Sequence, residues 1–375
     1  MKRNVFFLIC IGCVFTLLQC DNSGILDDEY NIDSIESWDY STIAFIGRIT
    51  DNSSDWSLCT VDESGNGMRK IVDKTLACQK PVRSNFGTKL LFTTVKFDSW
   101  VNEDNSVGMS SEYELYIVNT DGTGLDLIDR IIPAEPGNFG SLAWSPDDRQ
   151  IIYVKYSGAH REKCDLIQYN ISNNTHKTIK TEGNICTPTF SPNGNQIVYC
   201  TSTETGHHIY RMDVDGNNSQ LIINHSSSPK WSPQVDKIVY LSSGELGSSQ
   251  IFVANSDGSN QKQLTTTISP RLWPGWPPDG NSEPQWTPDG KKIVYVSSEN
   301  ERAEIFIMNA DGSKQRRLTK AEYWDGSPEI TPDGKYILFH SRRSDMMESG
   351  IIMMELNGEN QRVLTKEGAY PVACR

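Results

Sequence analysis

Histidine is the side chain of this sequence best suited to acid–base or metal chemistry, and its six copies are scattered. They stand at His160, His176, His207, His208, His225 and His340. His207 and His208 are neighbours in an expected strand, where successive side chains point to opposite faces, so they cannot chelate one ion together. Three of the others fall in or near expected loops far apart in the chain. The pattern therefore predicts no catalytic residue, no metal site and no cofactor.

The amino terminus carries a signal for lipidation. A short basic start is followed by an apolar run over residues 5–18, which is too short to span a bilayer comfortably and is typical of a signal-peptide core. The run ends in Leu-Leu-Gln-Cys, which resembles a bacterial lipobox, although Gln19 stands where Gly, Ala or Ser is usual. We expect residues 1–20 to be a lipoprotein signal peptide with Cys20 as the lipidated residue. A plain secretory signal or an uncleaved anchor is the alternative.

The charge of the chain argues against nucleic acid as a partner. Lys and Arg number 35 against 48 Asp and Glu, a net charge of −13, and removing Lys2 and Arg3 with the signal leaves −15. A polyanionic partner needs a basic face. Residues 21–40 carry seven carboxylates and no basic residue, which is typical of a solvated tether. Because this acidic field opposes adsorption to anionic lipid, we expect the lipid anchor to hold the protein at the membrane.

Six cysteines follow this tether, and none of their spacings is the Cys-x-x-Cys of a metal or redox site. They are Cys59, Cys78, Cys164, Cys186, Cys200 and Cys374. An even number in an exported protein permits disulfides, with 15 possible connectivities for the six. Cys200 lies in a strand pattern and is predicted to be a buried apolar thiol.

One unit recurs along residues 41–375. Its first half reads SEPQWTPDGKKIVYVS at residues 282–297 and SSPKWSPQVDKIVYLS at residues 227–242; its second half reads IFIMNADGSKQRRLT at 305–319 and IFVANSDGSNQKQLT at 251–265. Pro-Asp-Gly and Asp-Gly are turn sequences, and the runs between them are rich in strand-forming residues. The Asp-Gly turns lack the later Glu of a calcium loop and are predicted to be hairpins. Each unit therefore predicts four antiparallel strands and no helix.

Seven such units are present. Their second strands are centred on Phe45, Phe92, Tyr153, Tyr199, Tyr240, Tyr295 and Phe339, at about 48 residues per unit, near the spacing of propeller repeats. The first unit has no first strand, and residues 368–374 resemble the missing one. We therefore predict an all-β fold over residues 41–375, a seven-bladed β-propeller of four-stranded antiparallel blades that the C-terminal strand closes. The recurring Trp144, Trp231 and Trp286 are assigned to packing between blades.

The Pro-x-Trp-Ser-Pro-Asp-Gly and Asp-Gly-Ser units resemble the TolB-like, WD40-like (PD40) repeats of bacterial propellers. The resemblance covers about 335 of the 375 residues and implies the fold more than the function. TolB itself joins an α/β domain to six blades, so its partners are not carried over. Among related enzymes, prolyl-oligopeptidase-type peptidases add a Gly-x-Ser-x-Gly hydrolase domain, a motif missing here. Oligogalacturonate lyases have a histidine-rich metal site in the channel, whereas these histidines are scattered.

Aromatic residues on the connections that precede first strands form the candidate binding site. Residues 266–283 are an insertion that four prolines stiffen, and stiff aromatic loops bind with little loss of entropy. In a propeller these connections gather on one face, around the channel mouth. The expected binding patch consists of Arg271, Trp273, Trp276, Tyr323, Trp324, Asp325 and Tyr370. The alternative is that the insertion folds over the channel and plugs it. A second insertion, residues 95–114, is expected to be a mobile surface loop.

The expected function is binding without catalysis. We expect a monomeric, lipid-anchored protein of the bacterial envelope, periplasmic or on the cell surface, whose propeller binds an envelope protein or peptide, or a glycan. The competing class is a carbohydrate-active enzyme, a polysaccharide lyase or hydrolase acting in the channel. Histidine, arginine and carboxylate side chains clustered around the axis would favour that class.

Overall fold

The computed structural model describes residues 8–11, 14–17, 42–47, 56–72, 81–101, 107–132, 137–158, 163–244, 248–267, 280–299, 302–322, 324–343 and 350–374. The chain divides into two compact units, Met1–Ser37 and Trp38–Arg375. In the first, β1 (Leu8–Ile11) pairs with β2 (Val14–Leu17) in an antiparallel hairpin. Cys20 and residues 21–40 lie outside the described residues. No helix long and apolar enough to cross a bilayer occurs in the described part of the chain.

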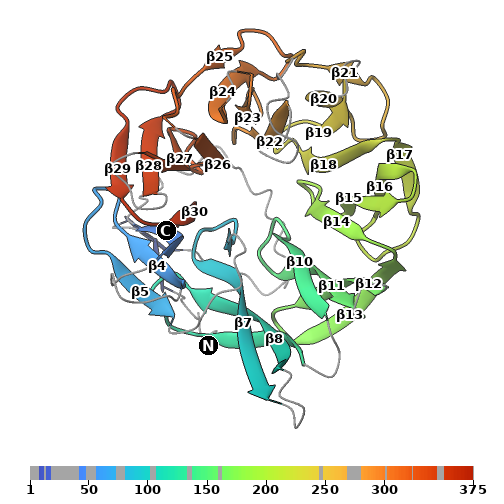
Figure 1. The fold of residues 1–375 in the computed structure, drawn as a ribbon, viewed down its shortest axis with the longest axis vertical. Coiled ribbons are helices and arrows are strands. Elements are labelled where there is room, and N and C mark those ends of the chain that lie inside the picture. The colour runs from blue at the N-terminus through green and yellow to red at the C-terminus, as the bar shows by residue number, and fades with distance from the viewer. Residues whose placement is uncertain are drawn as a thin grey trace, which may run out of the picture. The chain divides into compact units, whose positions relative to one another are not determined.

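The second unit is a ring of seven four-stranded antiparallel sheets, as the repeats predict (Figure 1). Blade 1 contains β30 (Ala369–Cys374), β3 (Thr42–Gly47), β4 (Ser57–Val61) and β5 (Arg69–Val72); blade 2 contains β6 (Val82–Arg83), β7 (Lys89–Val101), β8 (Val107–Asn119) and β9 (Asp126–Ile131). Blade 3 contains β10 (Gly137–Trp144), β11 (Gln150–Ser157), β12 (Lys163–Asn170) and β13 (Thr175–Glu182); blade 4 contains β14 (Ile185–Phe190), β15 (Gln196–Thr203), β16 (Gly206–Asp213) and β17 (Gln220–Ile223). Blade 5 contains β18 (Ser226–Trp231), β19 (Lys237–Ser243), β20 (Ser249–Asn255) and β21 (Lys262–Gln263); blade 6 contains β22 (Asn281–Trp286), β23 (Lys292–Ser297), β24 (Glu304–Asn309) and β25 (Arg316–Arg317). Blade 7 contains β26 (Trp324–Ile330), β27 (Tyr336–Arg342), β28 (Gly350–Glu355) and β29 (Arg362–Thr365).

The last strand closes the ring. β30 is the innermost strand of blade 1 and pairs antiparallel with β3, with Thr42 opposite Cys374 and Ala44 opposite Val372. The predicted closure by the C-terminal strand is therefore confirmed. β30 covers the inner edge of β3, which would otherwise be unpaired.

The core consists of apolar layers between neighbouring blades. The seven aromatic residues at the centres of the second strands are each at most 2% exposed. The repeat tryptophans reach across to the preceding blade: the indole N–H of Trp144 donates to the Val82 carbonyl at 3.1 Å, and that of Trp286 donates to the Lys230 carbonyl at 3.2 Å. The assignment of these tryptophans to packing between blades is confirmed.

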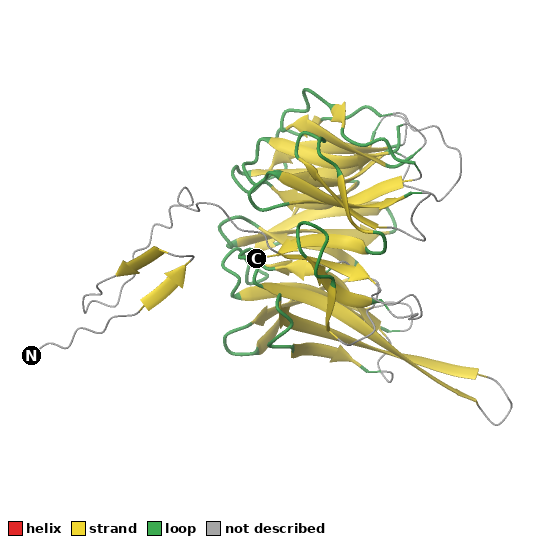
Figure 2. Ribbon diagram, turned by 90° about the vertical axis from the view of Figure 1, so that its left-hand side faces the viewer, coloured by secondary structure: helices red, strands yellow, loops and turns green. Residues whose placement is uncertain are grey.

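The two faces of the ring differ in their connections. Each of the six connections between a first and a second strand is five residues long, whereas those between second and third strands, or from a fourth strand to the next blade, range from two to seventeen residues. Because the strands are antiparallel, the first kind gathers on one face, the short-turn face, together with the Asp-Gly hairpins. The second kind gathers on the other, the long-connection face. Figure 2 shows the ring edge-on, with the short turns along one side of the strands.

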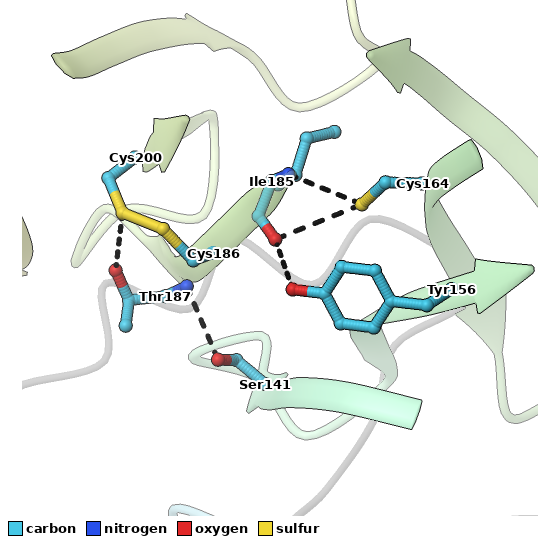
Figure 3. The surroundings of a disulfide bond; sticks show 7 residues. All are labelled: Ser141, Tyr156, Cys164, Ile185, Cys186, Thr187 and Cys200. Atoms are coloured by element: carbon cyan, nitrogen blue, oxygen red, sulfur yellow. Dashed lines mark hydrogen bonds between the residues drawn. A yellow bond between two sulfur atoms is a disulfide. The ribbon is translucent and has the colours of Figure 1, made fainter. Parts of the chain in front are cut away.

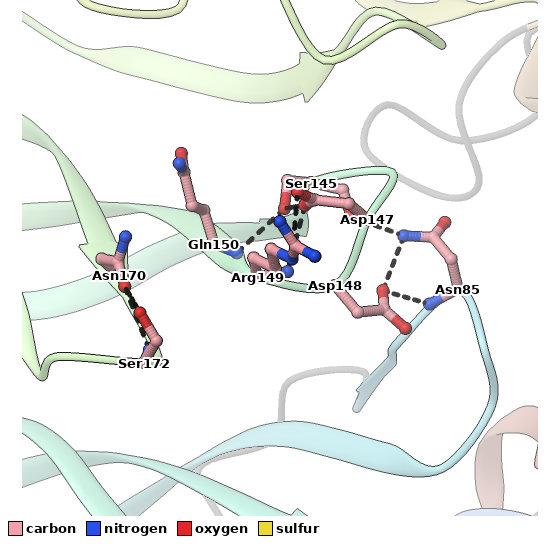
Figure 4. A network of polar contacts seen from close by, with 8 residues as sticks. All are labelled: Asn85, Ser145, Asp147, Asp148, Arg149, Gln150, Asn170 and Ser172. Carbon is pink, nitrogen blue, oxygen red and sulfur yellow. Dashed lines mark hydrogen bonds and ion pairs between the residues drawn. The ribbon is translucent and has the colours of Figure 1, made fainter. Parts of the chain in front are cut away.

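Polar contacts between neighbouring turns tie blades together on the short-turn face. The Asn85 side-chain amide donates to the Ser145 carbonyl at 2.7 Å and to the Asp148 carboxylate at 2.8 Å (Figure 4). Asp148 itself has a φ of 55°, which the tight turn after β10 requires. The regular turns are thus structural elements that connect blades 2 and 3.

The prediction of a loop over residues 95–114 is wrong. β7 and β8 are thirteen-residue strands that stay paired from Lys89 opposite Asn119 to Val101 opposite Val107. The outer part forms a two-stranded ribbon that extends beyond the blade (Figure 2). Residues 95–101 read VKFDSWV, whose partial alternation of apolar and polar residues is a strand pattern.

Candidate binding site on the long-connection face

A β-bulge recurs in the innermost strand of five blades. A residue with φ between 45° and 55° interrupts the pairing with the second strand, directly before a proline. These residues are Thr187, Ser228, Glu283, Ser327 and Tyr370. Proline has no N–H to continue the ladder, and a bulge redirects the side chains around it. The repeated residue–proline pair was the signal for this feature, and the sequence analysis did not use it.

Polar contacts link the bulges of adjacent blades near the axis. The Ser327 N–H donates to the Glu283 carboxylate at 2.7 Å, and the Gln285 amide donates to the Pro328 carbonyl at 3.0 Å. At the junction of blades 6 and 7 the innermost strands therefore bind each other through backbone and side-chain polar groups.

An aromatic cluster joins blades 7 and 1 at the long-connection end. The ring of His340, in β27, stands edge-on to Trp324 with ring centroids 4.3 Å apart, and its centroid is 5.5 Å from that of Tyr370. Gly326, which is opposite His340, permits this approach, because an added Cβ would lie 3.3 Å from both neighbouring rings. Trp324 and Tyr370 are partly exposed, and His340 is 5% exposed. The sequence analysis predicted both partly exposed residues and missed the histidine between them.

Of the other predicted patch residues, the structure describes only Asp325. Arg271, Trp273, Trp276 and Tyr323 lie outside the described residues. Asp325 is only 2% exposed, so its carboxyl does not belong to an open surface. Burial raises the pKa of Asp325, and the Ser341 and Thr319 hydroxyls partly oppose this shift.

Asp325 lies beside Glu304, which occupies a repeated polar position that the sequence analysis missed. In five blades the residue before the buried apolar part of the third strand has a charged, amide or imidazole side chain; these residues are Glu114, Asp165, His208, Gln250 and Glu304. Each contacts a residue of the fourth strand or just after it; the Asp165 carboxylate, for example, accepts from Thr181 at 2.6 Å. Because the residue types differ from blade to blade, alignment by residue type does not reveal the position.

Two blade junctions show the same network with different charge. Between blades 5 and 6, the Asn281 amide donates to Gln250 Oε1 at 3.1 Å and to Thr265 Oγ1 at 3.0 Å. Between blades 6 and 7, Glu304 and Asp325 occupy the places of Gln250 and Asn281. The Asp325 carboxylate has no amide hydrogen to donate, and its Oδ1 is buried without a hydrogen-bond partner among the described residues. This junction therefore brings two buried carboxyl groups together.

The prediction that Cys200 is a free buried thiol is wrong. Cys186 on β14 stands opposite Cys200 on β15, and the two form a disulfide with Cα atoms 5.1 Å apart (Figure 3). Strand patterns give the burial of Cys200 but not its partner, because the register that brings Cys186 opposite includes the bulge at Thr187. Cys59, Cys164 and Cys374 are buried and form no disulfide with one another or with another described cysteine.

A pocket lined mainly by serine and histidine residues opens between blades 4 and 5 on the long-connection face. Its volume is about 480 Å³, and its lining includes His207, His225, Ser226, Ser242 and Ser249. His207 and His208 do point to opposite faces of β16: His208 contacts Asn224 and Thr203, and His207 faces the pocket.

Comparison with known proteins relates the chain to bacterial propellers. A family model described as the TolB beta propeller domain, PD40, matches residues 81–282 and 277–374. The Tol-Pal system protein TolB of Thioalkalivibrio sulfidiphilus is 32% identical over 85 residues, which are 22% of this chain and 17% of that protein. The match thus spans less than a fifth of the length of this curated relative.

Solved structures with the same fold include a TolB protein and a lyase. TolB from Acinetobacter baumannii superposes with a TM-score of 0.53 at 18% identity, over 87% of this chain and 81% of that one. An oligogalacturonate lyase from Vibrio parahaemolyticus gives a TM-score of 0.62 at 13% identity, over 84% and 86%. At such identities the likeness concerns the fold alone, which proteins with different functions can share.

Proposed function

This chain belongs to the PD40 family, the TolB beta propeller domain, and from that premise we propose that it is a non-enzymatic module of the bacterial envelope that binds a protein or peptide. The aromatic cluster of Trp324, His340 and Tyr370 carries the proposal. Its rings stand on the first and second strands of two blades, so binding would cost little conformational entropy. Arg271, Trp273, Trp276 and Tyr323 would complete the patch on the same face.

The ribbon of β7 and β8 supports a peptide as the partner. Among the described residues, 97–101 and 107–111 pair only with each other, so no third strand in this part of the chain pairs with the outer backbone edge of either strand. Such an edge can pair with an added strand. Residues 96–112 contain one Lys and four acidic residues. A basic, extended peptide would complement this charge.

Lipidation at Cys20 would place the module at a membrane, as a monomer. Replacement by Cys20→Ala is expected to move the expressed protein from the membrane fraction to the soluble fraction, because one site would carry the whole anchor. Fractionation followed by immunoblotting measures this. Membrane retention of the variant would indicate an uncleaved signal anchor instead.

Trp324→Ala tests the binding patch. We expect at least a tenfold loss of affinity, about 1.4 kcal/mol, for a partner captured from envelope extract, because aromatic anchors dominate such interfaces. Phe86→Ala is the matched control, since Phe86 is 41% exposed on the short-turn face. Thermal melting is measured on the same samples.

The outcomes separate the candidate roles. If the wild type captures no partner and the Trp324→Ala variant melts at a much lower temperature, the patch would be a plug of the channel and not a binding site. Depolymerisation of a polysaccharide by the wild-type protein would instead support the carbohydrate-active enzyme, the class to which the similar lyase fold draws attention.

A further inference from the structure

The disulfide of blade 4 lies beside an imidazole. Cys186 stands opposite Cys200, and His207 stands opposite Ser202, two residues along β15 from Cys200. Side chains two residues apart share a face of a sheet, so all three project toward blade 5. The two Sγ atoms and a ring nitrogen of His207 all lie within 4.8 Å of one another. Reduction of the disulfide would therefore leave two thiols and an imidazole close together, and these groups ligate soft metal ions.

The surroundings leave one side of this group open. His207 is exposed to the pocket of about 480 Å³ between blades 4 and 5, and Cys186 is partly exposed. Cys200 is buried and accepts a hydrogen bond from the Thr187 hydroxyl at 3.5 Å. Cys200 is thus held within the blade. An ion and a water molecule could approach the group from the pocket, through His207.

We propose that Cys186, Cys200 and His207 bind a zinc ion when the disulfide is reduced. Two thiolates and one imidazole, with a fourth position open to solvent, form a tetrahedral set that zinc accepts in proteins. Reduction by a dithiol or phosphine breaks one S–S bond with two electrons and yields two thiols. Zinc then displaces a proton from each thiol. Reoxidation by a disulfide oxidant would re-form the S–S bond and release the ion, so the site is gated by redox state.

The sequence did not predict this site because its ligands come from three strands. The cysteines are 14 residues apart and His207 follows after seven more, so no short metal motif exists. In an oxidising compartment the disulfide is the expected resting form, and metal binding would report on reducing conditions.

The test is a metal titration of the full chain in both redox states. The protein is reduced with a phosphine, freed of reductant, and titrated with Co²⁺ as a spectroscopic probe, with circular dichroism recorded throughout. We expect one equivalent to bind the reduced, folded protein with thiolate-to-cobalt charge-transfer absorption, and Zn²⁺ to displace it. The oxidised protein should show no such absorption.

Variants identify the ligands. Cys186→Ser should abolish the charge-transfer band, and His207→Ala should weaken binding at least about tenfold, since loss of a ligand costs more than loss of its supporting contacts. His208→Ala is the matched control, because its ring points to the opposite face and should leave binding unchanged. The proposal is overturned if the reduced, folded protein gives no thiolate band, if Cys186→Ser binds as the wild type does, or if reduction unfolds the chain.

Discussion

Removal of residues 370–375 is expected to lower the melting temperature by about 10 °C or more. Within β30, Val372 is 1% exposed, and Ala373 and Cys374 are fully buried. Loss of the valine alone costs about 2 kcal/mol, and the lost ladder hydrogen bonds to β3 add about 1 kcal/mol each. The total is on the order of 5 kcal/mol, a large share of the stability of an ordinary domain. At about 2 °C per kcal/mol, this gives the expected shift.

The effect should depend on ring closure rather than on chain length. Val372 packs with Ala44, Leu58 and Phe92, so its loss also exposes the layer between blades 1 and 2. Val372→Ala should therefore destabilise by about 1–2 kcal/mol. Val363→Ala is the matched control in β29, since Val363 is 39% exposed, and should melt as the wild type does. Differential scanning calorimetry measures all three variants, and a deletion that leaves the melting curve unchanged would refute closure by β30.

The fold could be predicted because the same order of turn residues and buried strand residues recurs in each repeat. The aromatic residue at the centre of the second strand is buried in every blade, and the turns before and after it are specified by Pro-Asp-Gly and Asp-Gly. Seven repeats of this pattern specify a ring even where single units are degraded. The missing first strand of the first unit was as informative as the strands present, because only the C-terminal segment could supply it.

Only those residues of the candidate binding site that depart from the repeat pattern could be predicted from the sequence. Trp324 and Tyr370 could be singled out because they are aromatic residues outside the repeated tryptophan position. In the structure both contact the ring of His340. His340 could not be assigned to them, since it lies on another strand and its register depends on the bulge at Ser327. The disulfide was missed for the same reason: a bulge shifts the register, and sequence alone does not reveal which residues then stand opposite.

The junction of blades 6 and 7 leads to the second large effect. Asp325→Asn is expected to stabilise the folded protein by about 1–3 kcal/mol above neutral pH, the cost of a buried polar group without its partner. The new amide could donate to Glu304 and Thr319, as Asn281 donates to Gln250 and Thr265 one blade earlier. The rest of the network already matches: Ala321 N–H donates to Glu304 Oε1 at 3.1 Å, as Thr267 N–H donates to Gln250 Oε1 at 3.0 Å.

The pH dependence follows from the direction of the pKa shift. Burial, together with the Glu304 charge, raises the pKa of Asp325 above its ordinary value of 3.8, against the opposing effect of Arg343. The folded chain therefore keeps a proton that the unfolded chain releases as pH rises from about 4 to the raised pKa. Over this window the free energy of unfolding falls with rising pH, and below it this group causes no change. Asp325→Asn should remove that slope, because the amide does not titrate.

The reciprocal substitution is the sharpest control. Asn281→Asp places a carboxyl group in the same network between blades 5 and 6. Its partner Gln250 has no carboxyl group that could share a proton with it, and the amide that donates to Gln250 and Thr265 is lost. It should destabilise the protein above neutral pH and introduce the slope that Asp325→Asn removes. Urea denaturation of the wild type and both variants from pH 4 to pH 9 measures the three curves. Equal slopes in wild type and Asp325→Asn would show that Asp325 is ionised in the folded protein, with the Arg317 and Arg343 guanidinium groups compensating both carboxylates.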